Sequence, residues 1–302
     1  MSRQAPGTRK TIEAKVFAEM PEEFRRVNTA TQWANANRQG AAVDSFLEGP
    51  CFDEEGNLYV VDIPFGRVFR ITPEGSWSLA IEYDGEPNGL ALHRDGRLFI
   101  TDYRNGLMAF SPKTGLLERI LSRRNSESFK GVNDLVFAPN GDLYFTDQGQ
   151  SGLHDPTGRV FRYRPDGHLD CLVQNGPSPN GLALSPAGNA IFVAMTRDNS
   201  VWRIPLLSDG TTAKVGRFAS FHGTAGPDGL AMDTAGNLFV AHASLGKVFV
   251  LDREGYEIAH IRSNRGPTTT NLAFGGKDKK TIFITESATG SVLKAKWHIP
   301  GV

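Results

Sequence analysis

The chain has 302 residues, 39% of them hydrophobic and 22% charged, with Lys plus Arg and Asp plus Glu both at 33. This balance leaves no net field to attract nucleic acid or an acidic membrane surface, and the apolar runs are too short for a membrane span, so neither partner is expected. The two cysteines, Cys51 and Cys171, suggest no disulfide framework and the N-terminus has no apolar signal-peptide core, so a cytoplasmic location is predicted.

Residues 1–45 come before the first regular unit of the chain and are predicted to have two parts. The stretch IEAKVFAEM, residues 12–20, reads as a strand. The polar stretch that follows, residues 21–46, is partly helix-like. It is interpreted either as a lid over a central channel or as a solvated connector, with the connector favoured.

One pattern then recurs six times: a short apolar strand, a polar turn and a second apolar strand. The copies begin 40, 45, 47, 48 and 42 residues apart, at Glu48, Asn88, Asn133, Asn180, Asp228 and Thr270. Five copies carry a glycine at the same turn position (Gly56 in the first), where a hairpin needs a positive φ. A third strand follows in every copy and a less regular fourth lies between copies. Four strands in about 40–50 residues are the size of one propeller blade.

The pattern therefore predicts one all-β domain, residues 1–302, folded as a six-bladed β-propeller of four-stranded antiparallel blades. After Thr270 the chain has room for only three strands, so the last blade lacks its outer strand. Residues 12–20 are expected to supply that strand, which closes the ring and leaves no open sheet edge.

The first residue of each copy changes from blade to blade, whereas the glycine and the apolar positions repeat. Because equivalent positions surround the axis of a propeller, these six side chains are expected to form a ring at one mouth of the channel. Every one carries an oxygen atom, and Glu48 and Asp228 are acidic. Asn and Asp also favour turns, which would explain any one of them. Six in register favour a site for a hard divalent cation.

The sequence resembles the senescence-marker-protein/gluconolactonase/luciferin-regenerating family, in its bacterial lactonase branch, over about residues 44–298. The matching stretches are LEGPCFDEEGNLYVVD, VNDLVFAPNGDLYFTD, SPNGLALSPAGNAIFV and GPDGLAMDTAGNLFVA. The resemblance implies that Glu48, Asn180 and Asp228 hold a divalent cation and that Asn133 lies beside the metal or the substrate. The next residue, Asp134, matches an acid that is important in some relatives.

The resemblance also implies a metal-dependent lactonase, a carboxylic ester hydrolase that opens a sugar lactone or a related small γ- or δ-lactone with activated water. Asp228 is interpreted as the general base as well as a ligand, and the alternative, that it only coordinates the metal, stays open. Asn133 is counted among the ligands, and Asn133, Asn88 and Asp134 are expected to contact the substrate. Ca²⁺ is the expected cofactor, with Zn²⁺, Mg²⁺, Mn²⁺ and Fe²⁺ as alternatives.

Other functions remain as alternatives. Sugar-lactone relatives often carry an Arg two residues before the Asn of the Asn-Asp motif. Gly131 stands there in this chain, so the identity of the natural lactone stays open. The sequence also leaves the oligomeric state open. The chain has no Gly-x-Ser-x-Gly or His-Glu-x-x-His motif. The alternatives are a phosphotriesterase-like or other ester hydrolase on the same site, or a non-catalytic calcium-binding or interaction propeller. Glu48 and Asp228 in one column favour the enzyme.

Overall fold

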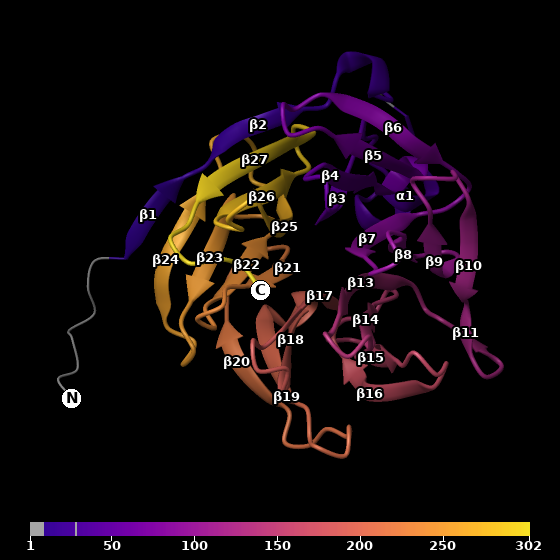
Figure 1. The fold of residues 1–302 in the computed structure, drawn as a ribbon, viewed down its shortest axis with the longest axis vertical. Coiled ribbons are helices and arrows are strands. Elements are labelled where there is room, and N and C mark those ends of the chain that lie inside the picture. The colour runs from indigo at the N-terminus through magenta and orange to yellow at the C-terminus, as the bar shows by residue number, and fades with distance from the viewer. Residues whose placement is uncertain (1–8, 28) are drawn as a thin grey trace.

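The computed structural model describes residues 9–27 and 29–302 and has the predicted fold. Six blades of antiparallel strands stand in a ring around a central axis, and the chain passes through them in order (Figure 1). The predicted all-β, six-bladed propeller is therefore confirmed. The predicted absence of a signal-peptide core concerns the N-terminus, of which residues 1–8 lie outside the described residues.

Blades 1 to 3 each run from the axis outward. Blade 1 consists of β3 (Leu47–Phe52), β4 (Leu58–Asp62), β5 (Arg67–Ile71) and β6 (Trp77–Glu82). Blade 2 consists of β7 (Pro87–Leu92), β8 (Leu98–Asp102), β9 (Gly106–Phe110) and β10 (Leu117–Leu121). Blade 3 consists of β13 (Val132–Phe137), β14 (Leu143–Asp147), β15 (Gly158–Tyr163) and β16 (Leu169–Gly176).

Blades 4 to 6 complete the ring. Blade 4 consists of β17 (Pro179–Leu184), β18 (Ala190–Met195), β19 (Ser200–Pro205) and β20 (Gly216–Ser220). Blade 5 consists of β21 (Pro227–Met232), β22 (Leu238–His242), β23 (Lys247–Leu251) and β24 (Glu257–Arg262). Blade 6 begins with β25 (Thr269–Gly275), β26 (Thr281–Glu286) and β27 (Ser291–Lys296).

The N-terminal segment closes the ring, as predicted, but it does so as two strands. Strand β2 (Lys15–Glu19) pairs antiparallel with β27 and is the outer strand of blade 6. Strand β1 (Lys10–Glu13) instead pairs parallel with β24, as a fifth strand of blade 5. The break lies at Ala14, whose N–H donates to the Arg262 carbonyl (2.9 Å). One continuous segment thus ties two blades together (Figure 1).

Little other regular structure is present in the described residues. It comprises α1 (Gln32–Asn37), the short 3-10 helices η1 (Glu22–Phe24), η2 (Ile63–Phe65) and η3 (Thr196–Asp198), and a hairpin of β11 (Arg123–Arg124) and β12 (Glu127–Ser128). No helix among these residues is long and apolar enough to cross a membrane. Cys51 and Cys171 are both half-buried free thiols.

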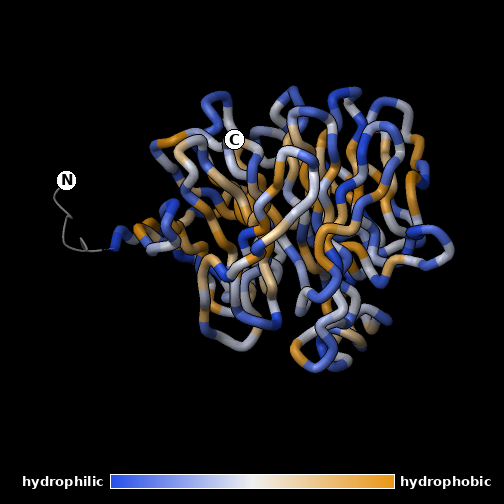
Figure 2. Tube along the Cα trace, turned by 90° about the horizontal axis from the view of Figure 1, so that it is seen from below, coloured by the Kyte–Doolittle hydropathy of each residue, from blue (hydrophilic) through white to orange (hydrophobic). Residues whose placement is uncertain are grey.

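The hydrophobic core is divided into six clusters, and each fills the space between two neighbouring blades. Between blades 6 and 1, for example, Leu58 and Phe69 pack with Phe283 and Val292. Blades therefore bury both faces, and every residue of their second strands is buried. Figure 2 shows the result: apolar segments run through the body of the ring and polar loops project from its two faces.

Buried carboxylates fix the loops that lead into the inner strands. Asp147, at the end of β14, accepts the N–H groups of Lys130 and Gly131 (2.8 and 2.9 Å) just before β13. The same position at the end of the second strand is a carboxylate in blades 1, 2 and 6, namely Asp62, Asp102 and Glu286. In blade 5 it is His242. These bonds satisfy backbone groups that would otherwise be buried without partners, and they hold the mouth of the channel in shape.

Candidate functional site

A cavity of about 170 Å³ lies at the mouth of the channel where the inner strands begin. Five of the six residues that open the repeats line it, and each comes from a different blade: Glu48, Asn88, Asn133, Asn180 and Asp228. Gln148, Thr196, Arg197 and Tyr103 complete its wall from the strands and loops. The structure therefore gathers into one place residues that the sequence spreads over 181 positions, from 48 to 228.

A repeated irregularity of the inner strands places these side chains. In every blade the pairing between the first and second strands shifts register where the repeat begins, for example between Glu48 and Cys51 and between Pro227 and Leu230. A β-bulge of this kind bends a strand and re-aims its side chains. The bulge lets two consecutive residues of an inner strand lie near the axis, as Asn133 and Asp134 do.

Thr270, the sixth member of the expected ring, is not among the residues that line the cavity. Its hydroxyl bonds the Leu47 carbonyl of the neighbouring blade and the Thr285 hydroxyl, both at 2.9 Å. The next residue, Asn271, takes its place near the acidic residues. Its Nδ2 donates to Glu48 Oε2 (2.9 Å), while its Oδ1 accepts the Leu272 N–H (2.8 Å). Asn271 was not predicted from the sequence, because it lies one position after the first column of the repeat.

Three buried carboxylates lie close enough to influence one another. Burial and, to a lesser degree, the charge of Asp134 raise the pKa of Asp228 to about 8, although the Arg197 guanidinium and a hydrogen bond from Asn180 oppose the shift. Burial and the Asp228 charge likewise raise the pKa of Glu48 well above its usual value. Asp134, which was expected to contact the substrate, is buried but is not among the residues that line the cavity, and burial raises its pKa to about 6. Each ionised form is thus costly unless a positive charge is nearby.

These residues fit a divalent cation, because its charge would offset both the desolvation and the mutual repulsion of the carboxylates. Within residues 9–27 and 29–302, no three His, Cys, Asp or Glu side chains are arranged to hold a metal by themselves. A cation here would take carboxylate oxygens from Glu48 and Asp228 and amide oxygens from Asn133 and Asn180. Such an all-oxygen set suits Ca²⁺ or Mg²⁺.

Gln148 orients the amide of Asn133. Asn133 Nδ2 donates to Gln148 Oε1 (2.8 Å), and Gln148 Nε2 donates to Ser178 Oγ (2.9 Å). Because the amide nitrogen of Asn133 is engaged in this bond, its Oδ1 is the atom left for a cation or a ligand. Gln148 was not predicted from the sequence; it follows the buried Asp147, and nothing in the repeat marks it.

Gln148→Leu is expected to weaken Ca²⁺ binding roughly 10- to 100-fold, the usual effect of removing a group that orients a ligand. Isothermal titration calorimetry with CaCl₂ measures the change. Gln174→Leu is the matched control, since Gln174 is exposed on the outer strand β16. Equal Ca²⁺ affinity in Gln148→Leu and wild type would contradict the assigned role of Gln148.

Gly131 stands at the position where sugar-lactone relatives often carry an Arg, and the structure leaves no room there for a side chain. Its φ is +146°, and a Cβ atom there would lie 2.4 Å from the ring of Tyr103. Tyr103 occupies that part of the cavity wall and accepts a hydrogen bond from Gln150 Nε2 at its hydroxyl (3.0 Å). The site therefore has an aromatic wall in place of a cationic one beside Asn133.

Helix α1 belongs to the same mouth. Trp33 is buried against Phe46, with ring centroids 4.6 Å apart, and Trp33, Asn37 and Arg38 line the cavity. The Thr31 hydroxyl caps the helix by accepting the Ala34 N–H (3.0 Å). The segment interpreted as a lid or a connector thus contributes directly to the cavity wall.

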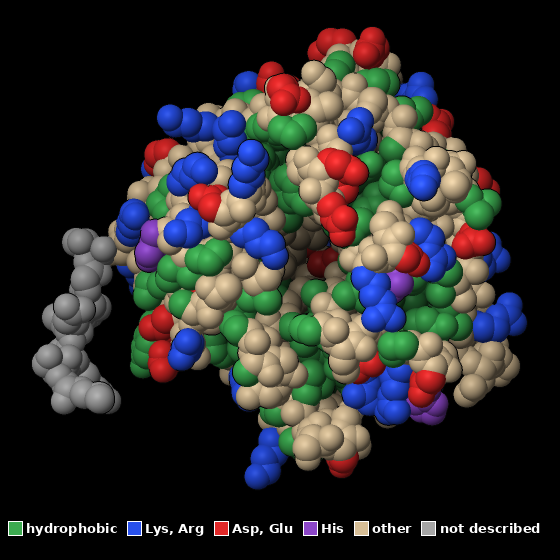
Figure 3. Space-filling model, in the orientation of Figure 1, with side chains coloured by type: hydrophobic (Ala, Val, Ile, Leu, Met, Phe, Trp, Pro, Cys, Tyr) green, Lys and Arg blue, Asp and Glu red, His purple; other side chains and the backbone are tan. Residues whose placement is uncertain are grey.

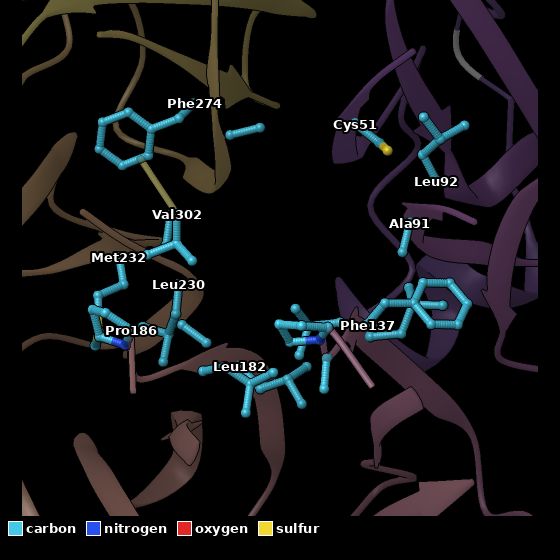
Figure 4. A pocket seen from close by; sticks show the side chains of 18 of the residues that line it. Cys51, Ala91, Leu92, Phe137, Leu182, Pro186, Leu230, Met232, Phe274 and Val302 are labelled. Atoms are coloured by element: carbon cyan, nitrogen blue, oxygen red, sulfur yellow. The ribbon is translucent and has the colours of Figure 1, made fainter. Parts of the chain in front are cut away.

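The other mouth of the channel has a different character. The inner strands end there in apolar residues, which line a cavity of about 690 Å³. Figure 4 shows Leu182, Leu230, Phe137 and Phe274 around this common space, with the C-terminal Val302 at one side. The face drawn in Figure 3 is hollowed at its centre between the blades. The apolar side chains of the inner strands line the channel below the acidic residues, and this surrounding explains why burial raises the pKa of their carboxylates.

Comparisons with known proteins agree with this arrangement. Residues 46–288 match the family model described as the SMP-30/gluconolactonase/LRE-like region. The chain is 33% identical over 246 residues to the lactonase drp35 of Staphylococcus epidermidis, covering 77% of this chain and 73% of the relative, and 32% identical over 247 residues to that of Staphylococcus aureus, with the same coverage.

Solved structures share the fold. The gluconolactonase XC5397 of Xanthomonas campestris has a TM-score of 0.75 at 21% identity, covering 98% of this chain and 99% of that one. The calcium-binding protein regucalcin of Agrobacterium tumefaciens has a TM-score of 0.76 at 21% identity, covering 97% of each chain. At these identities the likeness establishes the propeller alone.

Proposed function

Because this chain belongs to the SMP-30/gluconolactonase/LRE-like family, we propose that it is a lactonase that opens a small lactone ring with a divalent cation, Ca²⁺, at the site of Glu48, Asn133, Asn180 and Asp228. One observation carries the proposal: two buried carboxylates and two amides from four blades line a single small cavity, and neither carboxylate forms an ion pair within the described residues. The match to lactonases over most of the chain supports the reaction class.

Hydrolysis of a lactone needs a nucleophilic water and relief of the charge that develops on the carbonyl oxygen. A bound divalent cation would supply both, by lowering the pKa of water and by polarising the carbonyl. Asp228 accepts the proton of the attacking water and returns it to the ring oxygen as the ester bond breaks. Asp228 suits this role because it is a buried carboxylate that lines the same cavity as the amides of Asn88 and Asn133. Asn88 and Asn133 orient the substrate through their amides.

A pH-indicator assay with a panel of γ- and δ-lactones tests the proposal. We expect acid release from at least one lactone, its loss on treatment with a chelator, and its return when Ca²⁺ is added in excess. Acid release from no lactone, with Ca²⁺ binding retained, would instead indicate a non-catalytic calcium-binding propeller. Acid release that the chelator leaves unchanged would contradict the proposed dependence on a metal.

A further inference from the structure

Two arginines line the same cavity as the acidic residues, and each comes from a segment outside the inner strands. Arg38 follows α1, and Arg197 lies in η3 between β18 and β19. Both side chains are exposed, and neither guanidinium forms an ion pair within the described part of the chain. The acidic neighbour of Arg197, Asp198, pairs with Arg217 instead (2.8 Å). Both charges are therefore available to a ligand.

The backbone holds Arg197 close to the acidic floor of the cavity. The preceding residue, Thr196, is buried, and its hydroxyl donates to the Pro227 carbonyl (2.8 Å), directly before Asp228. The Thr196 N–H donates to the Ser178 carbonyl (3.0 Å). These two hydrogen bonds of the buried Thr196 to backbone carbonyls fix the position of the backbone from which the Arg197 side chain extends.

Arg38 is placed by packing. Its guanidinium carbon lies 6.0 Å from the centroid of the Phe46 ring, and that ring is held by Trp33 on the other side of the loop. The Arg38 N–H donates to the Ala34 carbonyl (2.8 Å) and ends the helix. A guanidinium presents several N–H donors in one plane and binds carboxylate or phosphate in a two-pronged manner. Two such groups line a single cavity of about 170 Å³.

We propose that Arg38 and Arg197 bind an anionic substituent of the substrate, a carboxylate or a phosphate, so that the preferred lactones carry a negative charge away from the ring ester. This inference rests on the proposed lactonase activity and names its substrate class. The ester would lie over Asp228 at the floor of the cavity, and the charged substituent would extend to the rim. A neutral lactone would leave both guanidiniums unpaired.

Steady-state kinetics with matched lactones tests the inference. The carboxylate arm compares glucaro-γ-lactone with glucono-γ-lactone, and the phosphate arm compares phosphorylated glucono-δ-lactone with glucono-δ-lactone. We expect wild type to favour the anionic member of at least one pair. Arg197→Gln and Arg38→Gln should each lower kcat/KM for that member roughly 10- to 100-fold more than kcat/KM for the neutral member, mainly through KM. Arg197→Lys should retain part of the preference.

Arg203→Gln is the matched control, because it removes the same charge from an exposed position of β19 outside the cavity. An equal fall for neutral and anionic lactones in Arg197→Gln would mean that Arg197 acts only on Asp228, and the inference would be wrong. It would also be wrong if wild type preferred the neutral members. Should no lactone be hydrolysed, the proposed function fails, and calorimetric binding of the same pairs to wild type and Arg197→Gln still decides whether the arginines select anions.

Discussion

Asp228→Asn is expected to lower kcat/KM for lactone hydrolysis about 10³-fold, the largest effect of any single substitution considered for this protein. Asparagine keeps a side-chain oxygen for a cation but cannot accept a proton at neutral pH. The substitution therefore separates the two roles assigned to Asp228. If Ca²⁺ affinity measured by calorimetry falls far less than activity, Asp228 is the general base. If both fall in parallel, Asp228 is a ligand only.

The fold of the Asp228→Asn variant should not suffer. Burial and Asp134 raise the pKa of Asp228 in the metal-free protein to about 8, so its ionised form opposes folding at every pH above its unfolded value of about 3.9. The neutral amide removes that cost, and the thermal midpoint in chelator should equal or exceed that of wild type. Asp166→Asn, on an exposed turn, is the control for activity. If the Asp228→Asn variant kept the kcat/KM of wild type, Asp228 would have no role in the reaction.

The architecture could be predicted because each repeat is defined by residues close together in the sequence. Apolar strands, a glycine such as Gly56 with φ +86° in five of the six turns, and a missing outer strand at the C-terminus together require a closed ring. The division of the N-terminal segment at Ala14 could not be predicted, because both halves read as strand. Which blade each half joins depends on pairing partners about 250 residues away.

The candidate site could be predicted only in part, for a geometric reason. The first column of the repeat led to Glu48 and Asp228, which the structure brings to one cavity. The column itself did not reveal the bulge, and the bulge is what brings a second residue, Asn271, near the axis while Thr270 turns to the next blade. Gln148 and Arg197 lie in loops outside the repeat, so no periodic signal could have identified them.

His242 departs from its column in a way that has a consequence for stability. It stands where four of the other blades have a carboxylate, it is fully buried, and neither ring nitrogen has a well-formed hydrogen bond within the described residues. Its neighbours are the rings of Phe221 and Phe249. Burial in apolar surroundings lowers its pKa to about 4, and nearby backbone groups offset the shift only partly.

We expect His242 to make the protein sensitive to acid. The unfolded chain takes up the imidazole proton near pH 6.5, whereas the folded protein takes it up only near pH 4. Folding stability should therefore fall as the pH drops from 6.5 to 4, by about 3 kcal/mol from this group alone. His242→Leu, which fills a similar volume among the phenylalanines, should not show this loss.

Urea denaturation at several pH values measures the difference between His242→Leu and wild type, and carboxylates that titrate in the same range cancel because both proteins contain them. His154→Gln is the control, since His154 is exposed and its removal should leave the acid sensitivity intact. Near neutral pH the two proteins should unfold at similar denaturant concentrations, and the advantage of leucine should grow steadily below pH 6.5. A constant difference between them across this range would mean that the imidazole is protonated equally in the folded and unfolded states, and burial would then have no effect on its charge.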